Sequence, residues 1–396
     1  MKEINFESNI WKYYCFEFFM GLWFTLPISV IFLRNFNITY GSIGFIEFIA
    51  ALVVVLLEIP TGTFSDFMGR KITLLIASLF WCVAMLTIGF GSTLPMFLLG
   101  FILWAISDSL LSGTKSAFIY DTLKRFQSEK QYLRIKGISS FIESISIIVA
   151  SILGSYLYSV NVRLPWIFFG ASAFLASIFI LLSKEPYKKN TRFTIPNQIK
   201  HMKESVAFVI KNEYVRWIIV FASVIILPFS IFNNILKQPY ILYTGFQVIS
   251  LGWITALIYG LSGVTSLYSR KIENYLGKKS SFLIITLLHG IGFLLLGLFR
   301  SEPMILVIIV IYICRSYKDN ILELYINKNV DSSKRTTVLS ISNLTVSLFS
   351  AFYILIGGRL LDLYNIQAVL VGIGIAVTAL GLPIIFLRFF KEDIRY

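Results

Sequence analysis

Twelve long apolar segments constrain this chain more than any other feature of its sequence. A helix needs about 20 mostly apolar residues to cross a lipid bilayer, and the 396 residues contain twelve such runs in succession. The predicted spans are 11–34, 42–64, 72–90, 94–121, 135–160, 164–183, 214–243, 248–269, 280–299, 303–328, 336–358 and 366–388. The runs are continuous rather than alternating, which favours helices over the strands of an outer-membrane barrel. The sequence therefore predicts an all-α membrane protein.

The composition indicates a lipid rather than an aqueous environment. Charged residues make up 14% of the chain and hydrophobic residues 57%, whereas a soluble domain carries about 25% charged residues. In water such a chain would expose large apolar patches. This excludes a soluble enzyme and a nucleic-acid-binding protein, despite the net charge of +14. Three scattered cysteines and two histidines favour neither a disulfide framework nor a metal site, so we expect no metal and no cofactor.

The basic residues are distributed unevenly enough to predict an orientation. If both termini and the even-numbered loops share one side, 27 of the 35 Lys and Arg residues lie on that side. Four lie on the other side and four within spans. Basic residues gather on the cytoplasmic face of a membrane. We therefore expect both termini in the cytoplasm, in a multi-pass protein of the cell membrane.

The longest connection divides the chain into two halves. We predict a six-helix bundle at 1–183, a cytoplasmic linker at 184–213 and a second six-helix bundle at 214–396. Within the linker, apolar residues recur at helical spacing between basic ones, which favours an amphipathic helix on the inner leaflet. A solvated basic linker is the alternative, but it leaves the apolar period unexplained. We expect the chain to act as a monomer.

Ionisable residues within the spans are concentrated on every third helix. Such residues cost at least about 2.5 kcal/mol at mid-bilayer, so they usually face protein or water. Spans three, six and twelve carry none in their interiors, whereas spans one, four, seven and ten carry most of them. These are Glu17, Asp108, Lys115, Lys237, Arg315, Lys318, Asp319 and Glu323, and span five adds Glu143. A triplet of helices whose opening member faces a polar path is typical of transporters built from repeats.

Three carboxyl groups are candidates for proton coupling. Asp108 lies near the middle of span four, Glu143 lies in span five and Glu17 in span one. A low dielectric disfavours the charged form of a carboxyl group, so such a group can bind and release a proton near neutral pH. Lys115 follows Asp108 by two helical turns on the same face. The alternative interpretation is therefore a structural ion pair between Asp108 and Lys115.

Span ten carries a second charged series. Arg315, Asp319 and Glu323 follow one another at steps of four residues. This spacing fits a polar path and fits equally well an ion pair between Arg315 and Asp319 that is satisfied within the helix.

The most specific motif lies between spans two and three. Its fixed residues are Gly62, Asp66, Gly69, Arg70 and Lys71. They match the G-x-x-x-D-x-x-G-R-[RK] pattern, and the segment resembles the loop signature of the major facilitator superfamily. With Glu58 and Pro60 upstream, it is also similar to a variant in clostridial-type tetracycline efflux proteins. The resemblance implies two pseudo-symmetric bundles of six helices, proton-coupled drug efflux and a bacterial cell membrane.

The same resemblance implies a gate. In this family the Arg of the motif pairs with an acid at the inner end of span four, a place that Asp121 occupies here. The resemblance thus implies a latch made from Asp66, Arg70 and Asp121. A weaker copy of the motif at 270–279 supports a duplication of the two halves, whereas span five lacks the Gly-Pro of the antiporter signature. Efflux and proton antiport are therefore implied by the resemblance alone.

The favoured hypothesis is a secondary transporter that exports amphipathic, drug-like molecules against proton influx by alternating access. We expect its partners to be a small molecule, protons and the lipid bilayer, with no nucleic acid. The residues expected to line the substrate path are Lys115, Lys237, Arg315, Asp319, Glu323, Trp104 and Tyr312. Aromatic walls with a few charges suit amphipathic ligands.

Two alternatives stay open. On the same fold, the protein could import or export an anionic metabolite or lipid, with the cations of the spans binding the anion. A non-transporting membrane receptor is an alternative of another class, although no loop is long enough to hold an output domain. An enzyme is excluded because no nucleophile–base set, metal cluster or nucleotide-binding loop is present in the sequence.

Overall fold

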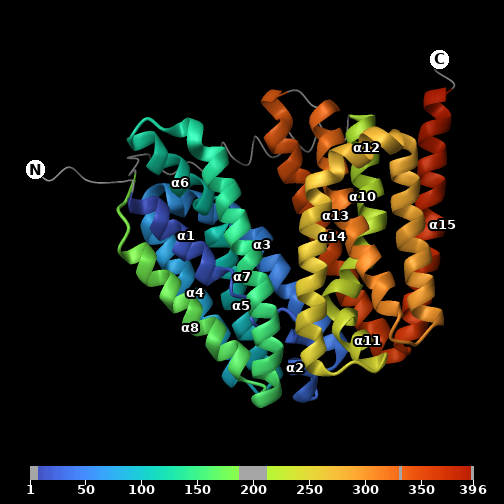
Figure 1. The fold of residues 1–396 in the computed structure, drawn as a ribbon, viewed down its shortest axis with the longest axis horizontal. Helices are drawn as coiled ribbons and strands as arrows, with labels where there is room; N and C mark the ends of the chain where they lie inside the picture. Colours follow the sequence, from blue (N-terminus) through green and yellow to red (C-terminus); the bar gives the residue numbers. More distant parts are fainter. Residues whose placement is uncertain (1–7, 187–211, 330–331, 394–396) are drawn as a thin grey trace, which may run out of the picture. The chain divides into compact units, whose positions relative to one another are not determined.

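The fold is almost entirely helical in the part of the chain that the structure describes, residues 8–186, 212–329 and 332–393 (Figure 1). The structure is a computed structural model. Nine helical stretches of these residues are long and apolar enough to cross a membrane, and one of them, Val248–Leu298, covers two predicted spans. The first and tenth predicted spans correspond to further helices. The predicted all-α membrane fold is confirmed.

The chain forms two compact units. Unit 1 holds the described residues within Met1–Ile38, Ile49–Gln198 and Val248–Ala256. Unit 2 holds those within Thr39–Phe48, Ile199–Gln247 and Leu257–Tyr396. Residues 187–211 fall outside the described part of the chain, so the amphipathic helix predicted there stays a prediction, as do the domain limits at 184–213.

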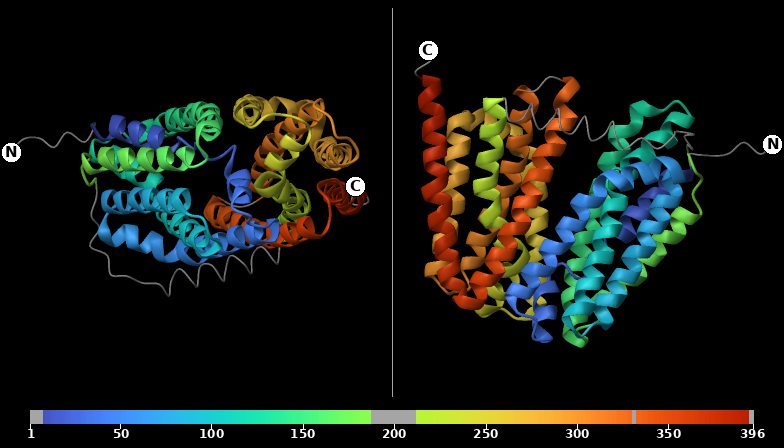
Figure 2. Two further views of the ribbon diagram at one scale, coloured as in Figure 1. Left: turned by 90° about the horizontal axis from the view of Figure 1, so that it is seen from below. Right: turned by 180° about the vertical axis from the view of Figure 1, so that it is seen from behind.

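Unit 1 is built from helices of the first half of the chain. They are α1 (Ser8–Met20), α2 (Ser29–Asn35), most of α3 (Tyr40–Met68), α4 (Arg70–Phe90), α5 (Leu94–Leu111), α6 (Thr114–Arg125), α7 (Tyr132–Val160) and α8 (Leu164–Leu181). Helix α4 packs along α5 and α8, and α1 packs along α8 (Figure 2). Fully buried alanines at these contacts, among them Ala77, Ala84 and Ala173, let the helix backbones approach closely, as is usual in membranes.

Unit 2 is built from helices of the second half. They are α10 (Glu213–Ile231), a π-helical turn η2 (Phe232–Leu236), α11 (Lys237–Tyr243), most of α12 (Val248–Leu298), α13 (Met304–Asn329), α14 (Ser332–Leu363) and α15 (Ile366–Asp393). Helix α10 packs against α14 and α15. Its buried face includes Phe221, Ile225 and Phe229, and the burial of such side chains is worth about 1.5–3 kcal/mol each relative to water.

Two predicted spans are interrupted. The first span divides into α1 and α2, with an irregular stretch that contains Pro27, a residue that lacks the N–H needed to continue a helix. The fourth span divides into α5 and α6 at Gly113, which has a φ of +72°. A left-handed φ is readily adopted only by glycine. The prediction that Asp108 and Lys115 share one helix face is therefore wrong, because they lie on different helices.

Candidate functional site

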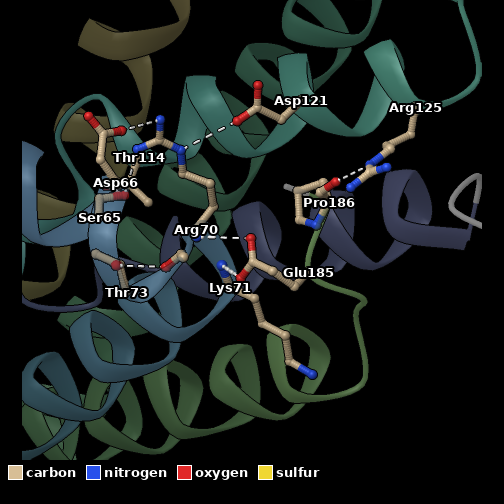
Figure 3. A network of polar contacts seen from close by, with 11 residues as sticks. Ser65, Asp66, Arg70, Lys71, Thr73, Thr114, Asp121, Arg125, Glu185 and Pro186 are labelled. Atoms are coloured by element: carbon tan, nitrogen blue, oxygen red, sulfur yellow. Dashed lines mark hydrogen bonds and ion pairs between the residues drawn. The ribbon is translucent and has the colours of Figure 1, made fainter. Parts of the chain in front are cut away.

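Residues of the loop motif form a cluster of polar contacts at the junction of α3 and α4 (Figure 3). Arg70 forms an ion pair with Asp66 at 2.6 Å, and its Nε lies 3.4 Å from Oδ2 of Asp121. Its Nη1 donates to Oγ of Ser65 at 2.9 Å, and Ser65 also accepts from Thr114. The geometry thus brings the two acids of the expected latch to one guanidinium group.

Glu185 belongs to this cluster, although it lies outside the loop motif. Its carboxylate accepts from the backbone N–H groups of Arg70 at 3.0 Å and Lys71 at 2.9 Å. These are the first residues of α4, whose N–H groups have no partner inside the helix and carry partial positive charge. Figure 3 shows Glu185 to the right of the Arg70 backbone, and Pro186 beside Arg125. The start of the linker is thereby fastened to the motif.

The turn itself depends on Gly69. Its φ of +97° and ψ of 152° lie in a region that is essentially restricted to glycine. A Cβ at this position would lie 2.6 Å from Oε2 of Glu185. The other residues of the predicted motif, Glu58, Pro60 and Gly62, lie within α3, and Gly62 has open space around its Cα.

A polar cavity of about 320 Å³ lies within unit 1. Asp108, Lys115 and Glu143 line it together with Trp23 and Trp81. Trp104 does not line the cavity but packs edge-on against Trp81, with 6.0 Å between ring centroids. Two candidates for proton coupling, Asp108 and Glu143, thus line the same cavity as the predicted path residue Lys115.

Lys115 pairs with a residue other than the one expected. Its Nζ lies 2.6 Å from Oε2 of Glu17, whose side chain is 2% exposed. Within the described ranges, neither Asp108 nor Glu143 makes an ion pair or a side-chain hydrogen bond. The alternative of a structural Asp108–Lys115 pair is therefore replaced by a Glu17–Lys115 pair, because the break at Gly113 places Lys115 on α6 beside α1.

A second polar cavity of about 350 Å³ lies within unit 2, between α12 and α13. Tyr312, Arg315 and Asp319 line it. Oδ2 of Asp319 lies 3.6 Å from Nε of Arg315, and Oδ1 lies 3.0 Å from Nζ of Lys318. The ion pair expected within span ten is present. Glu323 is exposed and does not line the cavity.

Lys237 also belongs to this region. It is 3% exposed and directly follows the π-helical turn η2. Its Nζ lies 5.4 Å from the ring centroid of Tyr312, and the Tyr312 hydroxyl donates to Oδ1 of Asn233 at 2.6 Å. Isolated π turns in helices are frequent at functional sites. The predicted path residues Lys237, Arg315 and Asp319 thus gather near Tyr312.

The described residues contain no group of three or more His, Cys, Asp and Glu side chains placed to hold a metal ion. Both cavities are lined by charged, hydroxyl and aromatic groups instead. Such surfaces can bind small polar or amphipathic molecules and exchange protons at carboxylates.

Comparison with known proteins places the chain among transporters. The sequence profile of the Major Facilitator Superfamily matches residues 15–316 and 218–395. An uncharacterized MFS-type transporter, YxaM of Bacillus subtilis (strain 168), is 25% identical over 347 residues, 84% of each chain. Multidrug resistance protein 1 of the same organism is 26% identical over 190 residues, 48% of each chain. The crystal structure of a point mutant of the nucleoside transporter NupG superposes with a TM-score of 0.82 over 96% of this chain and 99% of that one, at 14% identity; this likeness shows the fold alone.

Proposed function

Because the chain belongs to the Major Facilitator Superfamily and is a multi-pass membrane transporter rather than an enzyme, we propose that it exports amphipathic small molecules in exchange for protons. Asp108 and Glu143 carry the protons in this proposal, and the transporter works by alternating access with both termini in the cytoplasm. Tetracycline-type specificity is not part of the proposal, because the comparisons with known proteins do not support a choice of compound.

One observation carries the proposal. Asp108 and Glu143 line the same cavity without an ion pair to any described residue, whereas the nearby Lys115 is neutralised by Glu17 at 2.6 Å. A carboxylate that is already paired would resist protonation, but an unpaired one beside a membrane-embedded cavity can bind and release a proton. The charged lining of the cavity therefore consists of two carboxyl groups suited to coupling, of Lys136, and of Lys115, which Glu17 pairs from outside the lining.

The direction of transport rests on relatives. A multidrug resistance protein of Bacillus subtilis shares 26% identity over 48% of both chains, which supports efflux of drug-like molecules. The alternative on the same fold is transport of an anionic metabolite or lipid. It is favoured by two observations among the described residues: Lys237 lies over the Tyr312 ring, and Asp319 is shared by the two cations Arg315 and Lys318.

The cluster around Arg70 is proposed to act as a conformational latch. The side chains of its ion pairs with Asp66 and Asp121 are partly exposed, so each pair is worth about 1 kcal/mol or less. Contacts of that strength can stabilise one state and still break during a transport cycle. Glu185 joins the latch through the backbone of α4.

The test is ligand-driven proton movement in liposomes that contain the purified protein and a trapped pH-sensitive dye. A cationic dye, a tetracycline and an anionic aromatic acid are added in turn. We expect at least one amphiphile to drive proton flux, and expect Asp108→Asn to abolish it because the amide cannot ionise. Glu302→Gln changes an exposed acid outside the cavity and should retain the flux. Proton flux that survives both Asp108→Asn and Glu143→Gln would refute the coupling role.

A further inference from the structure

Lys237 is a buried cation that has no carboxylate partner among the described residues. It is 3% exposed, and within the described ranges it makes no ion pair and no hydrogen bond. Its contact is with the face of the Tyr312 ring at 5.4 Å. A cation–π contact stabilises a buried ammonium group by less than the desolvation of that group costs. The ring alone does not offset that cost.

The surroundings of Lys237 are cationic as well. Arg315 lies one helical turn after Tyr312 on α13 and lines the cavity with it. Its guanidinium group lies over the ring of Phe229 at 4.7 Å, and its ion pair with Asp319 is long, at 3.6 Å. Asp319 also binds Lys318 at 3.0 Å, so one carboxylate serves two cations. Among the described residues, the single carboxylate of Asp319 is thus the ion-pair partner of both Arg315 and Lys318, and Lys237 has none.

Two neutral polar side chains of the cavity already donate hydrogen bonds within the protein. Ser316 donates to the carbonyl of Ser262 at 2.8 Å, and Asn320 donates to Ser266 at 2.9 Å and to Ser269 at 3.0 Å. These bonds join α12 to α13 and occupy those donors. The cavity presents the guanidinium group of Arg315 and the rings of Tyr259 and Tyr312 to a ligand. The positive charge of Lys237 lies close by, over the Tyr312 ring.

We propose that the cavity lined by Tyr312 and Arg315, with Lys237 beside it, binds the negatively charged group of an amphipathic substrate, such as the carboxylate of an aromatic acid. The anion neutralises the excess charge, and its apolar body packs on the rings of Tyr259 and Tyr312. This inference deepens the proposed transport function by naming the charge class of its substrate, and it rests on that function for its biological meaning.

The test measures ligand binding at equilibrium, without transport and without a proton gradient. A negative result would therefore count against anion binding and would not bear on proton coupling at Asp108 and Glu143. The full-length protein in detergent is titrated calorimetrically with naphthoate, naphthylmethylammonium and naphthylmethanol, which share one ring system and differ in charge. We expect naphthoate to bind at least about tenfold more tightly than the other two, a difference of about 1.4 kcal/mol.

Variants locate the site. Lys237→Met should weaken naphthoate binding about tenfold, and Lys237→Arg should restore most of it, because charge rather than shape is required. Arg315→Gln should weaken it further. The control is Arg300→Gln, which removes a cation stacked on Tyr243 at 3.8 Å elsewhere in unit 2 and should leave the Kd unchanged. Equal Kd values for naphthoate in the wild type and in well-folded Lys237→Met, or preference for the ammonium, would overturn the proposal.

Discussion

The two units use the same kinds of side chain to different ends. In unit 1, the buried Glu17 closes an ion pair with Lys115 and leaves the carboxyl groups of Asp108 and Glu143 facing a cavity. In unit 2, the buried Lys237 has no carboxylate partner, and a single acid, Asp319, serves two other cations among the described residues. Among the described residues, the cavity of unit 1 thus offers two carboxyl groups without an ion pair, and the region around Tyr312 and Asp319 in unit 2 holds more cations than carboxylates.

The backbone corners at Gly69, directly before α4, and at Gly277, within α12, differ in a similar way. Gly69 and Gly277 both adopt a positive φ, +97° and +73°, with ψ near extended values of 152° and 171°. In unit 1, Glu185 caps the helix that follows Gly69. In unit 2, nothing lies within 4 Å of a Cβ placed on Gly277. A Cβ at this backbone corner would therefore meet Glu185 in unit 1, whereas among the described residues of unit 2 it would meet open space.

The largest effect on stability is expected from Gly69→Ala. An alanine in this backbone conformation carries about 1–3 kcal/mol of strain. Its Cβ would also lie 2.6 Å from Oε2 of Glu185 and would displace that carboxylate. We expect a loss of about 3 kcal/mol, measured as a lower thermal midpoint in detergent. Gly277→Ala has open space and should cost only the strain. Equal losses would show that Glu185 does not distinguish the two corners.

The next effect concerns the closed pair of unit 1. Glu17→Gln keeps the shape of the side chain but leaves Lys115 without its counter-charge. Removing one partner of a fully buried pair costs about 3–5 kcal/mol, and since Lys115 is 22% exposed we expect about 2 kcal/mol. The thermal midpoint should recover in the double variant Glu17→Gln/Lys115→Met. Failure to recover would mean that the two residues are not coupled.

Lys237→Met should act in the opposite direction. Because Lys237 is buried without a carboxylate, its replacement by an apolar side chain of similar length removes a desolvation cost. We expect a gain of about 1 kcal/mol in stability together with the loss of anion binding. A destabilised variant would indicate that Lys237 makes a net favourable contact. Lys237 would then stabilise the fold as the paired Lys115 does, and the proposed difference between the two lysines would be wrong.

The smallest effect is expected from Asp121→Asn. The Arg70–Asp121 contact is 3.4 Å long and partly exposed, so its loss should cost about 0.5 kcal/mol. If the cluster is a latch, the variant should still change the rate at which cysteines introduced on α4 and α6 react with a thiol reagent during transport. An unchanged labelling pattern would leave the cluster a structural feature only.

The fold could be predicted well from sequence because bilayer thickness dictates the length of the apolar runs. The break at Gly113, where φ is +72°, could not, since a single glycine in an apolar run is usually tolerated. The pairing of Lys115 with Glu17 likewise depends on how α6 lies against α1.

Glu185 was missed for a similar reason. It lies among basic residues at the start of the linker and is distant in sequence from the helix it caps. An isolated acid next to a predicted helix N-terminus on the same membrane face was the available signal. Lys237 was recognised as ionisable, but only its surroundings reveal that it has no partner among the described residues.

The central claim is a division of labour, with proton binding at Asp108 in unit 1 and substrate binding at Tyr312 and Arg315 in unit 2. The most direct test compares two modes of transport in liposomes with Asp108→Asn, using the compound that drives proton flux best. The account predicts that substrate exchange without a pH gradient continues at close to the wild-type rate, while gradient-driven accumulation is lost. Loss of both modes, or retention of both, would contradict it.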